Sequence, residues 1–222
     1  MIIPISYPLN AKTPLYPKTP ALVIRLVRSI EQGDSVNTSR ITMSNHSGTH
    51  IDAPSHFYKE GATIADFLTM DTRFFPGYCI NVPKHESSEI SVQDLEESIT
   101  QMQDAEAILL RTGWHAIRFD DPKRYCNDHP WVSPDVPQFL REKCPRLRLF
   151  GIDQISVSSV LHHHVGRECH RKFLFGKRPI LILEDLNLSA IGINGSFMLR
   201  IYPFVIDDID GVPVIAIVET EH

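Results

Sequence analysis

The segment Asn45–Phe57 constrains this chain more than any other, because polar and apolar residues alternate along it and its polar residues are potential metal ligands. His46, His50, Asp52 and His56 are all even-numbered, so an extended chain directs them to one face. The segment therefore predicts a strand with one packed face and one face that carries a cluster of ligands. The residues on the packed face are Thr49, Ile51, Ala53 and Phe57.

Backbone distances predict a bend inside this segment. A strand rises roughly 3.3 Å per residue, which puts the Cα atoms of His50 and Asp52 about 7 Å apart, close enough to share one ion. His46 and His50 would lie about 13 Å apart, too far for two imidazoles on one metal, so we expect the chain to fold back at Gly48. The proline after Asp52 is expected to redirect the chain again and to leave His56 beside the metal.

Two histidines and a carboxylate with an open coordination position form a ligand set for metal catalysis, whereas structural zinc sites usually have four protein ligands rich in cysteine. Such an ion lowers the pKa of water and polarises a carbonyl oxygen, while His56 can exchange protons with the reacting groups. A single buried histidine is more often a hydrogen-bonded core residue, but the joint spacing favours metal binding. The segment predicts a metal-dependent hydrolase, and a metal-binding protein without turnover is the alternative.

A second histidine-rich segment lies further along the chain. His162, His163 and His164 are consecutive, so at most one or two of them can face a single site, and a solvated loop is an equal alternative. His170 follows them, and Glu184 ends an apolar segment where it could bridge two ions. Three other histidines have no partner at ligand spacing and are predicted to lie on the surface: His85, His115 and His129.

Apolar and alternating segments predict more strand than helix. Ser91 and the pair Ser133–Pro134 are suitable first positions for two of the three expected helices. The irregular order of strands and helices favours an α/β fold with a β-barrel-like core and peripheral helices over a doubly wound sheet. The expected helices span 91–102, 133–143 and about 166–175, and the expected strands span 22–27, 40–44, 78–82, 107–111, 147–152, 179–183, 197–201 and 212–218.

Length, composition and net charge restrict the number of domains and the classes of binding partner. A chain of 222 residues, 42% hydrophobic and 22% charged, predicts a single domain over residues 1–222. Its net charge of -5, without a long basic run, argues against nucleic acid as a partner. The absence of a basic leader and of an apolar stretch of about 20 residues predicts a cytoplasmic protein without a membrane contact. Four dispersed cysteines indicate reduced thiols.

The motif His-x-Gly-Thr-His-x-Asp-x-Pro-x-His-Phe, at residues 46–57, resembles the signature of the cyclase family of metal-dependent hydrolases, which includes bacterial kynurenine formamidase. The resemblance implies that His46, His50 and Asp52 bind a first ion, that Asp52 also binds a second, and that His56 is the catalytic acid or base. It implies zinc or manganese, with one or two ions per chain. Shorter similarities extend over most of the chain, at Leu15–Pro17, Leu110–Trp114, Gly151–Asp153 and Ile182–Leu186.

The same resemblance assigns three further residues. His170 and Glu184 match ligands of the second ion, and Tyr16 matches an aromatic residue that lies against the substrate. The triplet His162–His164 offers competing ligands for that second position. The family fold is a swivelling α/β barrel, and its members form homodimers or larger assemblies.

These observations together predict hydrolysis of a small aryl amide, with N-formylkynurenine giving kynurenine and formate as the preferred reaction. Tyr16 and Trp114 are candidates to stack on the aromatic ring. The enzymatic alternative is hydrolysis of a cyclic amide or a lactone, as in an isatin hydrolase, because the residues of the pocket rather than the metal motif decide the substrate.

Overall fold

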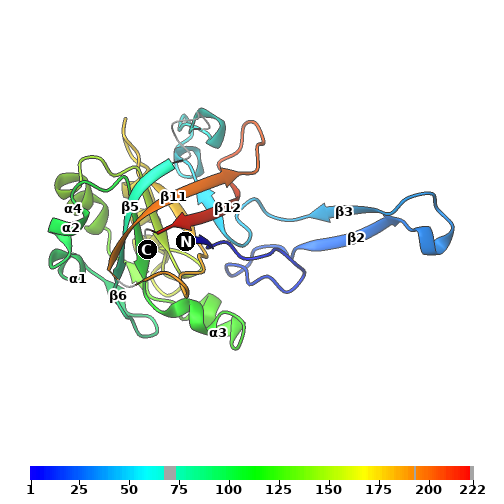
Figure 1. The fold of residues 1–222 in the computed structure, drawn as a ribbon, viewed down its shortest axis with the longest axis horizontal. Helices are drawn as coiled ribbons and strands as arrows, with labels where there is room; N and C mark the ends of the chain where they lie inside the picture. The colour runs from blue at the N-terminus through cyan, green and yellow to red at the C-terminus, as the bar shows by residue number, and fades with distance from the viewer. Residues whose placement is uncertain (68–73, 193, 221–222) are drawn as a thin grey trace.

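The computed structural model describes residues 1–67, 74–192 and 194–220, and its core is a β-barrel (Figure 1). Among the described residues, seven strands pair into a closed ring in the order β12, β11, β5, β7, β9, β10, β4 and back to β12. The predicted α/β fold with a barrel-like core is therefore confirmed. The barrel strands are β4 (His50–Asp52), β5 (Phe74–Asn81), β7 (Ala107–Arg111), β9 (Leu149–Ile152), β10 (Leu181–Glu184), β11 (Gly195–Pro203) and β12 (Gly211–Glu219), and β1 (Ile2–Pro4) pairs with the end of β12.

Strand residues alternate between the barrel interior and its outer face. In β7, Ala107 and Leu109 belong to the cluster of side chains inside the barrel, whereas Ile108 and Leu110 belong to a second cluster outside it. Strands β5, β7, β9 and β10 are mutually parallel, and their buried faces explain the continuous apolar segments in the sequence. Burial on both faces is why these strands could be recognised from the sequence.

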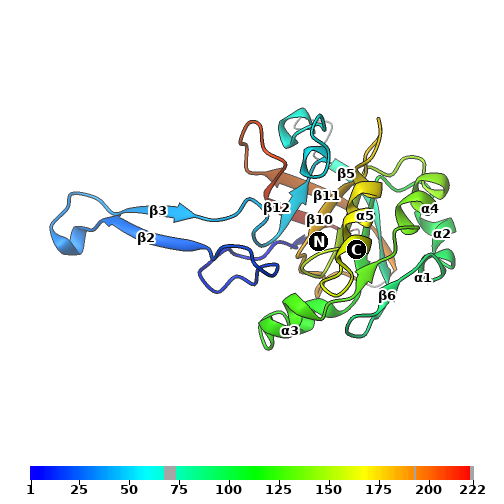
Figure 2. The same ribbon diagram turned by 180° about the vertical axis from the view of Figure 1, so that it is seen from behind.

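The helices pack on the outside of the barrel (Figure 2). Leu95, Met102, Leu140 and Phe173, from four different helices, join the outer apolar cluster. The helices are α1 (Gln93–Glu96), α2 (Ile99–Met102), α3 (Pro122–Asn127), α4 (Val136–Lys143) and α5 (His163–Leu174), with 3-10 turns at Ile30–Gln32, Pro54–His56, Ile64–Phe67 and Trp114–Ile117 and a short strand pair β6 (Glu89–Ile90) and β8 (Trp131–Val132). None of the helices in the described ranges is long and apolar enough to cross a membrane.

The predicted helix bounds differ from the observed ones in three places. The helix expected over 91–102 is divided into α1 and α2, because Ser98 leaves the helical region with φ -97° and ψ 2°. The helix expected from Ser133 begins at Val136, because the Ser133 amide donates to Ile90 O and so continues the β6–β8 pairing. The helix expected from Gly166 begins three residues earlier, so it includes two residues of the histidine triplet.

Two of the predicted strands do not belong to the barrel. The segments expected at 22–27 and 40–44 form β2 (Val23–Arg28) and β3 (Thr38–Thr42), which pair only with each other among the described strands. They project from the body as a two-stranded ribbon, called the arm below (Figures 1 and 2). The four cysteines are free and buried, as expected for reduced thiols.

Candidate metal centre and active site

Strand β4 carries two of the predicted ligands on the outer face of the barrel. His50 and Asp52 alternate with Ile51, whose side chain packs inside the barrel. In the antiparallel pairing of β4 with β10, His50 lies opposite Glu184 and Asp52 lies opposite Ile182. Residues opposite each other in a sheet share a face. Strand register therefore brings Glu184 to the histidine motif from a distant part of the sequence.

The expected bend at Gly48 is present. Gly48 adopts φ +66°, a conformation that favours glycine, and a Cβ there would lie 2.4 Å from Leu9 Cδ2. The turn brings the rings of His46 and His50 to a centroid distance of 5.2 Å. A straight strand would have separated these imidazoles, as the backbone distances predict.

Asp52 lies at the centre of the cluster. Its side chain is 1% exposed, with Oδ1 2.8 Å from His46 Nδ1 and 3.5 Å from His50 Nε2. Two groups of potential ligands have mutually close atoms, and both contain Asp52: one adds His46 and His56, the other His50 and Glu184. The position of Asp52 suits a carboxylate shared by two ions.

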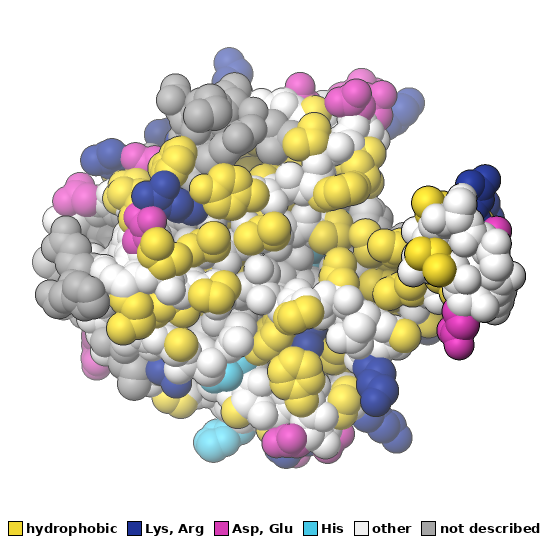
Figure 3. All heavy atoms as spheres, turned by 45° about the vertical axis from the view of Figure 1, so that its right-hand side comes forward, with side chains coloured by type: hydrophobic (Ala, Val, Ile, Leu, Met, Phe, Trp, Pro, Cys, Tyr) yellow, Lys and Arg dark blue, Asp and Glu magenta, His cyan; other side chains and the backbone are white. Residues whose placement is uncertain are grey.

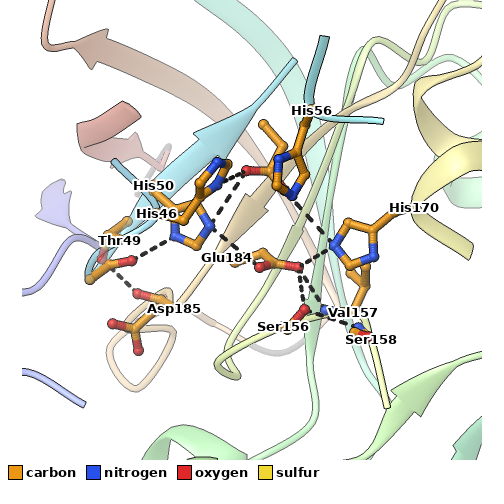
Figure 4. A network of polar contacts seen from close by, with 12 residues as sticks. His46, Thr49, His50, His56, Ser156, Val157, Ser158, His170, Glu184 and Asp185 are labelled. Atoms are coloured by element: carbon orange, nitrogen blue, oxygen red, sulfur yellow. Dashed lines mark hydrogen bonds and ion pairs between the residues drawn. The ribbon is translucent and has the colours of Figure 1, made fainter. Parts of the chain in front are cut away.

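Helix α5 contributes His170 to the same cluster (Figure 4). His170 Nε2 lies 3.3 Å from Glu184 Oε1 and 3.9 Å from Asp52 Oδ2. The histidine triplet lies further out: His163 lines the mouth of the cavity described below, while His162 and His164 are exposed and do not line it. Of the competing histidines, His170 is therefore the one that reaches the carboxylates.

The orientation of the rings fits a divalent cation. The Nδ1 atoms of His50 and His170 donate hydrogen bonds to Gly48 O (2.8 Å) and Gly166 O (2.9 Å). These bonds fix the ring orientation and direct Nε2 of each histidine toward the carboxylates, the arrangement typical of metal-ligating histidines. The distances of 3.3–3.5 Å from Nε2 to Glu184 and Asp52 exceed those of direct charge-assisted hydrogen bonds. The donors are nitrogen and carboxylate oxygen, which suits zinc or manganese.

Glu184 is held by the chain on its other side. Its Oε1 accepts hydrogen bonds from the Val157 amide (2.7 Å) and the Ser156 hydroxyl (3.0 Å) (Figure 4). Burial alone would raise the pKa of Glu184, but the interactions with the adjacent His170 and His50 outweigh burial and hold that pKa well below its usual value. The carboxylate is therefore ionised and oriented before any ligand arrives.

His56 lies beside the cluster with a partner that the sequence does not reveal. His56 Nδ1 is 2.7 Å from Asp210 Oδ2, and the same oxygen is 3.1 Å from His46 Nε2. Asn45 Nδ2 donates to Asp210 Oδ1 at 2.7 Å. Asp210 lies in a stretch with several other acidic residues just before β12, so no sequence signal distinguishes it. Hydrogen bonds from His46 and His56 strongly lower the pKa of the Asp210 carboxyl.

The charges around His46 favour its protonated form in the metal-free protein. Burial alone would lower its pKa, but the carboxylates of Asp52 and Asp210 raise the pKa of His46 to about 10. Both ring nitrogens then face carboxylates, and a metal ion at this position would replace a proton.

A cavity of about 480 Å³ opens over the cluster, and Tyr16 is part of its wall. Phe57 lies on the wall as well and stacks on the His170 ring at a centroid distance of 5.0 Å. Lys18 and Arg167 are the cationic side chains among the lining residues that the structure describes. Trp114, expected as a possible stacking partner, instead lies in the core and donates from Nε1 to Tyr125 O, so that expectation was wrong.

Two histidines predicted to lie on the surface are in fact largely buried. His129 is 3% exposed and donates to Pro130 O, and His115 Nδ1 is 2.6 Å from Asp153 Oδ2. His85 is exposed, as predicted. The prediction was wrong because it used only the absence of metal-ligand spacing. A histidine without such spacing can still be buried when it hydrogen-bonds to one polar group in the core.

A barrel with a cluster of histidines and carboxylates on its outer face, beneath an open cavity with an adjacent histidine–aspartate pair, has the arrangement expected of a metal-dependent hydrolase. Residues 3–159 match the cyclase family, whose description reads "Putative cyclase". The chain belongs to this family.

Proteins of similar sequence include kynurenine formamidases from species of Bacillus. The kynurenine formamidase of Bacillus thuringiensis (strain Al Hakam) is 34% identical over 216 residues, which cover 97% of this chain and 96% of that protein. The kynurenine formamidase of Bacillus anthracis is 33% identical with the same coverage. The similarity therefore extends over almost the whole of both chains.

Solved structures share the fold. Isatin hydrolase A from Labrenzia aggregata, bound to benzyl benzoate, has a TM-score of 0.82 with 20% identity and covers 98% of this chain and 93% of that one. A protein described as a predicted metal-dependent hydrolase, from Bacillus stearothermophilus, has a TM-score of 0.75 with 22% identity, and the match covers 98% of this chain and 97% of that one.

Proposed function

We propose that this protein is a metal-dependent amidohydrolase that hydrolyses N-formylkynurenine to kynurenine and formate. The observation that carries the proposal is the convergence of His46, His50, Asp52 and Glu184 beside the pair His56–Asp210, within a chain that resembles kynurenine formamidases over nearly its full length. The reaction cleaves the bond between the formyl carbon and the aryl nitrogen.

The proposed ligand assignment follows the family resemblance, with Asp52 shared by both ions. His46, His50 and Asp52 would hold a first ion, and Asp52, His170 and Glu184 would hold a second. The donor set supports zinc or manganese. When bound, such an ion polarises the formyl carbonyl and activates water.

His56 is the proposed acid and base. The Asp210 carboxylate fixes its Nδ1, so Nε2 is left to exchange a proton with the substrate. The departing aryl amine must gain a proton when the amide bond breaks, and a histidine at the wall of the cavity can supply it. Asp210 does not reach the substrate in this scheme: it orients the His56 ring through the contact with Nδ1.

The cavity suits an aromatic molecule that carries a carboxylate. Tyr16 and Phe57 offer aromatic surface to the ring of the substrate. Lys18 and Arg167 offer positive charge at the mouth, and no acidic partner for either is found among the described contacts. The α-carboxylate of N-formylkynurenine would complement them.

Hydrolysis of a cyclic amide or a lactone is the second candidate, and the structural similarity to isatin hydrolases supports it. A metal-binding protein without turnover is the third. The open cavity beside His56 argues against this third candidate, because a storage site has no use for a proton donor next to its ligands.

Assembly and location are proposed from the family and the composition. The family resemblance supports a homodimer or a larger homo-oligomer, and the composition supports a cytoplasmic location. A small molecule is the expected binding partner in either case.

The test is a hydrolysis assay on zinc- and manganese-loaded protein with N-formylkynurenine, isatin and a simple lactone. We expect the formyl substrate to have the highest kcat/KM and His56→Ala to lower it by about 10²- to 10⁴-fold. The matched control is His85→Ala, an exposed histidine away from the cavity. Preferred hydrolysis of isatin would replace the first candidate with the second, and no turnover of any substrate would favour the third.

A further inference from the structure

A buried ion pair lies next to the metal cluster and has no part in the proposed reaction. The charged side chains visible on the face drawn in Figure 3 lie at the surface, whereas Arg118 and Asp185 are 1% and 0% exposed. Arg118 Nε and Nη2 donate to the two carboxylate oxygens of Asp185 at 2.7 and 2.6 Å. The hydroxyl of Tyr125 donates to Oδ1 of the same carboxylate at 2.6 Å. The two charges are therefore paired inside the core.

Stability alone does not account for such a pair. Removing two charges from water costs free energy that their attraction repays only in part, and apolar side chains of similar volume often fill a core equally well. The surroundings suit apolar side chains, because the ring centroids of Tyr7, Phe119 and Tyr125 lie 3.8, 5.1 and 5.9 Å from Arg118 Cζ. An ion pair in such surroundings is better explained by a group that it holds in place.

Asp185 has an unusual backbone conformation at the end of β10. Its φ is +56°, in the left-handed region that aspartate, asparagine and glycine adopt more readily than other residues. Strand β10 ends at Glu184, and the pairing of β10 with β4 ends where Glu184 lies opposite His50. Such a backbone conformation persists where the surrounding structure fixes it. The contacts of Arg118 with the Asp185 carboxylate supply that restraint.

A side chain replaces the backbone pairing beyond Glu184. Thr49 Oγ1 donates to Asp185 O at 2.6 Å (Figure 4). The Tyr7 amide donates to the same Thr49 oxygen at 3.0 Å, and the Tyr7 ring covers the Arg118 guanidinium. Four residues therefore form a closed circle of contacts, called the anchor below: Tyr7, Thr49, Arg118 and Asp185.

The anchor is adjacent in the sequence to two of the proposed metal ligands. Thr49 directly precedes His50, and Asp185 directly follows Glu184. The anchor therefore holds the β4–β10 pair at the end where these ligands face each other, with His50 Nε2 3.4 Å from Glu184 Oε2. A metal ion needs its ligand atoms placed to within about 0.2 Å, so a small shift of either strand would weaken binding.

We propose that Arg118 is a positioning residue for the metal centre. Through the anchor it fixes the end of the β4–β10 pair, and thereby the separation of His50 and Glu184. Arg118 is not among the described residues that line the cavity over the cluster, so its effect on the centre is indirect. The inference gives a role to Thr49, the threonine of the histidine motif. It rests on the metal binding of the proposed function and not on the identity of the substrate.

The experiment measures zinc and manganese affinity by competition with a chelating indicator, beside the thermal midpoint of each metal-free protein. The principal variant is Arg118→Met/Asp185→Asn, which removes both charges together, because removing one partner leaves an unpaired charge in the core. Asparagine tolerates the left-handed backbone at this position. We expect a folded protein that binds metal about 10- to 100-fold more weakly than the wild type.

Thr49→Val tests the other side of the anchor. Valine keeps the shape of the side chain but neither donates to Asp185 O nor accepts from the Tyr7 amide, so we expect a similar loss of metal affinity. Thr49→Ser keeps the hydroxyl and should restore the affinity. Added to the Arg118→Met/Asp185→Asn variant, Thr49→Val should lower the affinity by less than it does alone, because both changes act on one circle of contacts.

Trp114→Phe is the matched control for loss of stability. Trp114 packs in the same cluster as Tyr125 and donates from Nε1 to Tyr125 O, but it does not belong to the anchor. This variant should lower the thermal midpoint and keep the metal affinity of the wild type. Wild-type affinity in the anchor variants, or an equal loss in Trp114→Phe, would overturn the proposal and leave the proposed function intact. A wild type that binds neither metal would overturn both.

Discussion

Glu184 lies directly opposite His50 in the β4–β10 pair, with its Oε2 3.4 Å from His50 Nε2. Residues far apart in the sequence thus form one side of the candidate metal centre through strand register alone. A shift of the register by one residue would turn Glu184 into the barrel and destroy the cluster.

Glu184→Gln should therefore lower metal affinity by at least about tenfold while preserving the fold. Glutamine keeps an oxygen for the Val157 amide and the Ser156 hydroxyl but removes the negative charge that attracts a cation. Metal content after dialysis, measured by mass spectrometry, is the readout. Glu168→Gln, an exposed α5 residue paired with Lys172, is the control, and equal metal retention by both variants would contradict the assignment.

Asp210→Asn should reduce kcat by about 10²-fold with a smaller change in KM, because the neutral amide holds the His56 ring in place less firmly than the carboxylate does. Asp208→Asn, two residues earlier and exposed, should leave kcat unchanged. An unchanged kcat in Asp210→Asn would argue against Asp210 as the residue that positions His56.

The contrast between predicted and missed residues has a physical origin. His46, His50 and Asp52 are close in sequence, so strand geometry and one glycine were enough to predict that they meet. Asp210 joins them only because β12 pairs with β4, a contact that no local pattern encodes. The family resemblance indicated His170, but the consecutive histidines before it offered similar chemistry, and only the position of α5 separates them from it.

The fold shows the same distinction. Strands buried on both faces, such as Ala107–Arg111, have continuous apolar sequences and were predicted at their observed bounds. Val23–Arg28 has a similar composition and was predicted as a strand, but nothing local revealed that it leaves the barrel. Strand propensity is a local property, whereas the choice of pairing partner depends on the whole chain.

Binding of the first ion should release about one proton at pH 7, because the pKa of His46, raised to about 10 by Asp52 and Asp210, keeps it protonated in the metal-free protein. Since the ion competes with that proton, affinity should fall as the pH is lowered and rise toward pH 10. Calorimetry in two buffers of different protonation enthalpy measures the release. The His46→Asn variant should bind the metal more weakly and should not release this proton. A binding enthalpy of the wild type that does not depend on the buffer would refute the prediction.

Arg167→Gln should raise KM for N-formylkynurenine by roughly two- to fivefold, the effect expected of an exposed ion pair, and leave kcat nearly unchanged. Formanilide, which lacks the carboxylate, should show no difference between the variant and wild type. Arg171→Gln, on the same helix but outside the cavity lining, is the control. Equal effects on both substrates would mean that Arg167 acts on the fold of α5 rather than on the carboxylate.

Gly48→Ala should destabilise the protein by about 1–3 kcal/mol, because alanine is strained at φ +66° and its Cβ would collide with Leu9 Cδ2. The carbonyl of Gly48 also accepts the hydrogen bond that orients His50, so the same change should weaken metal binding. Gly33→Ala separates the two effects: Gly33 has φ +95° in the arm, and a Cβ added there would meet no atom within 4 Å. The Gly33→Ala variant should lose stability through backbone strain alone and should retain its metal. If Gly48→Ala kept the metal affinity of the wild type, the bend would not be needed to position the imidazoles.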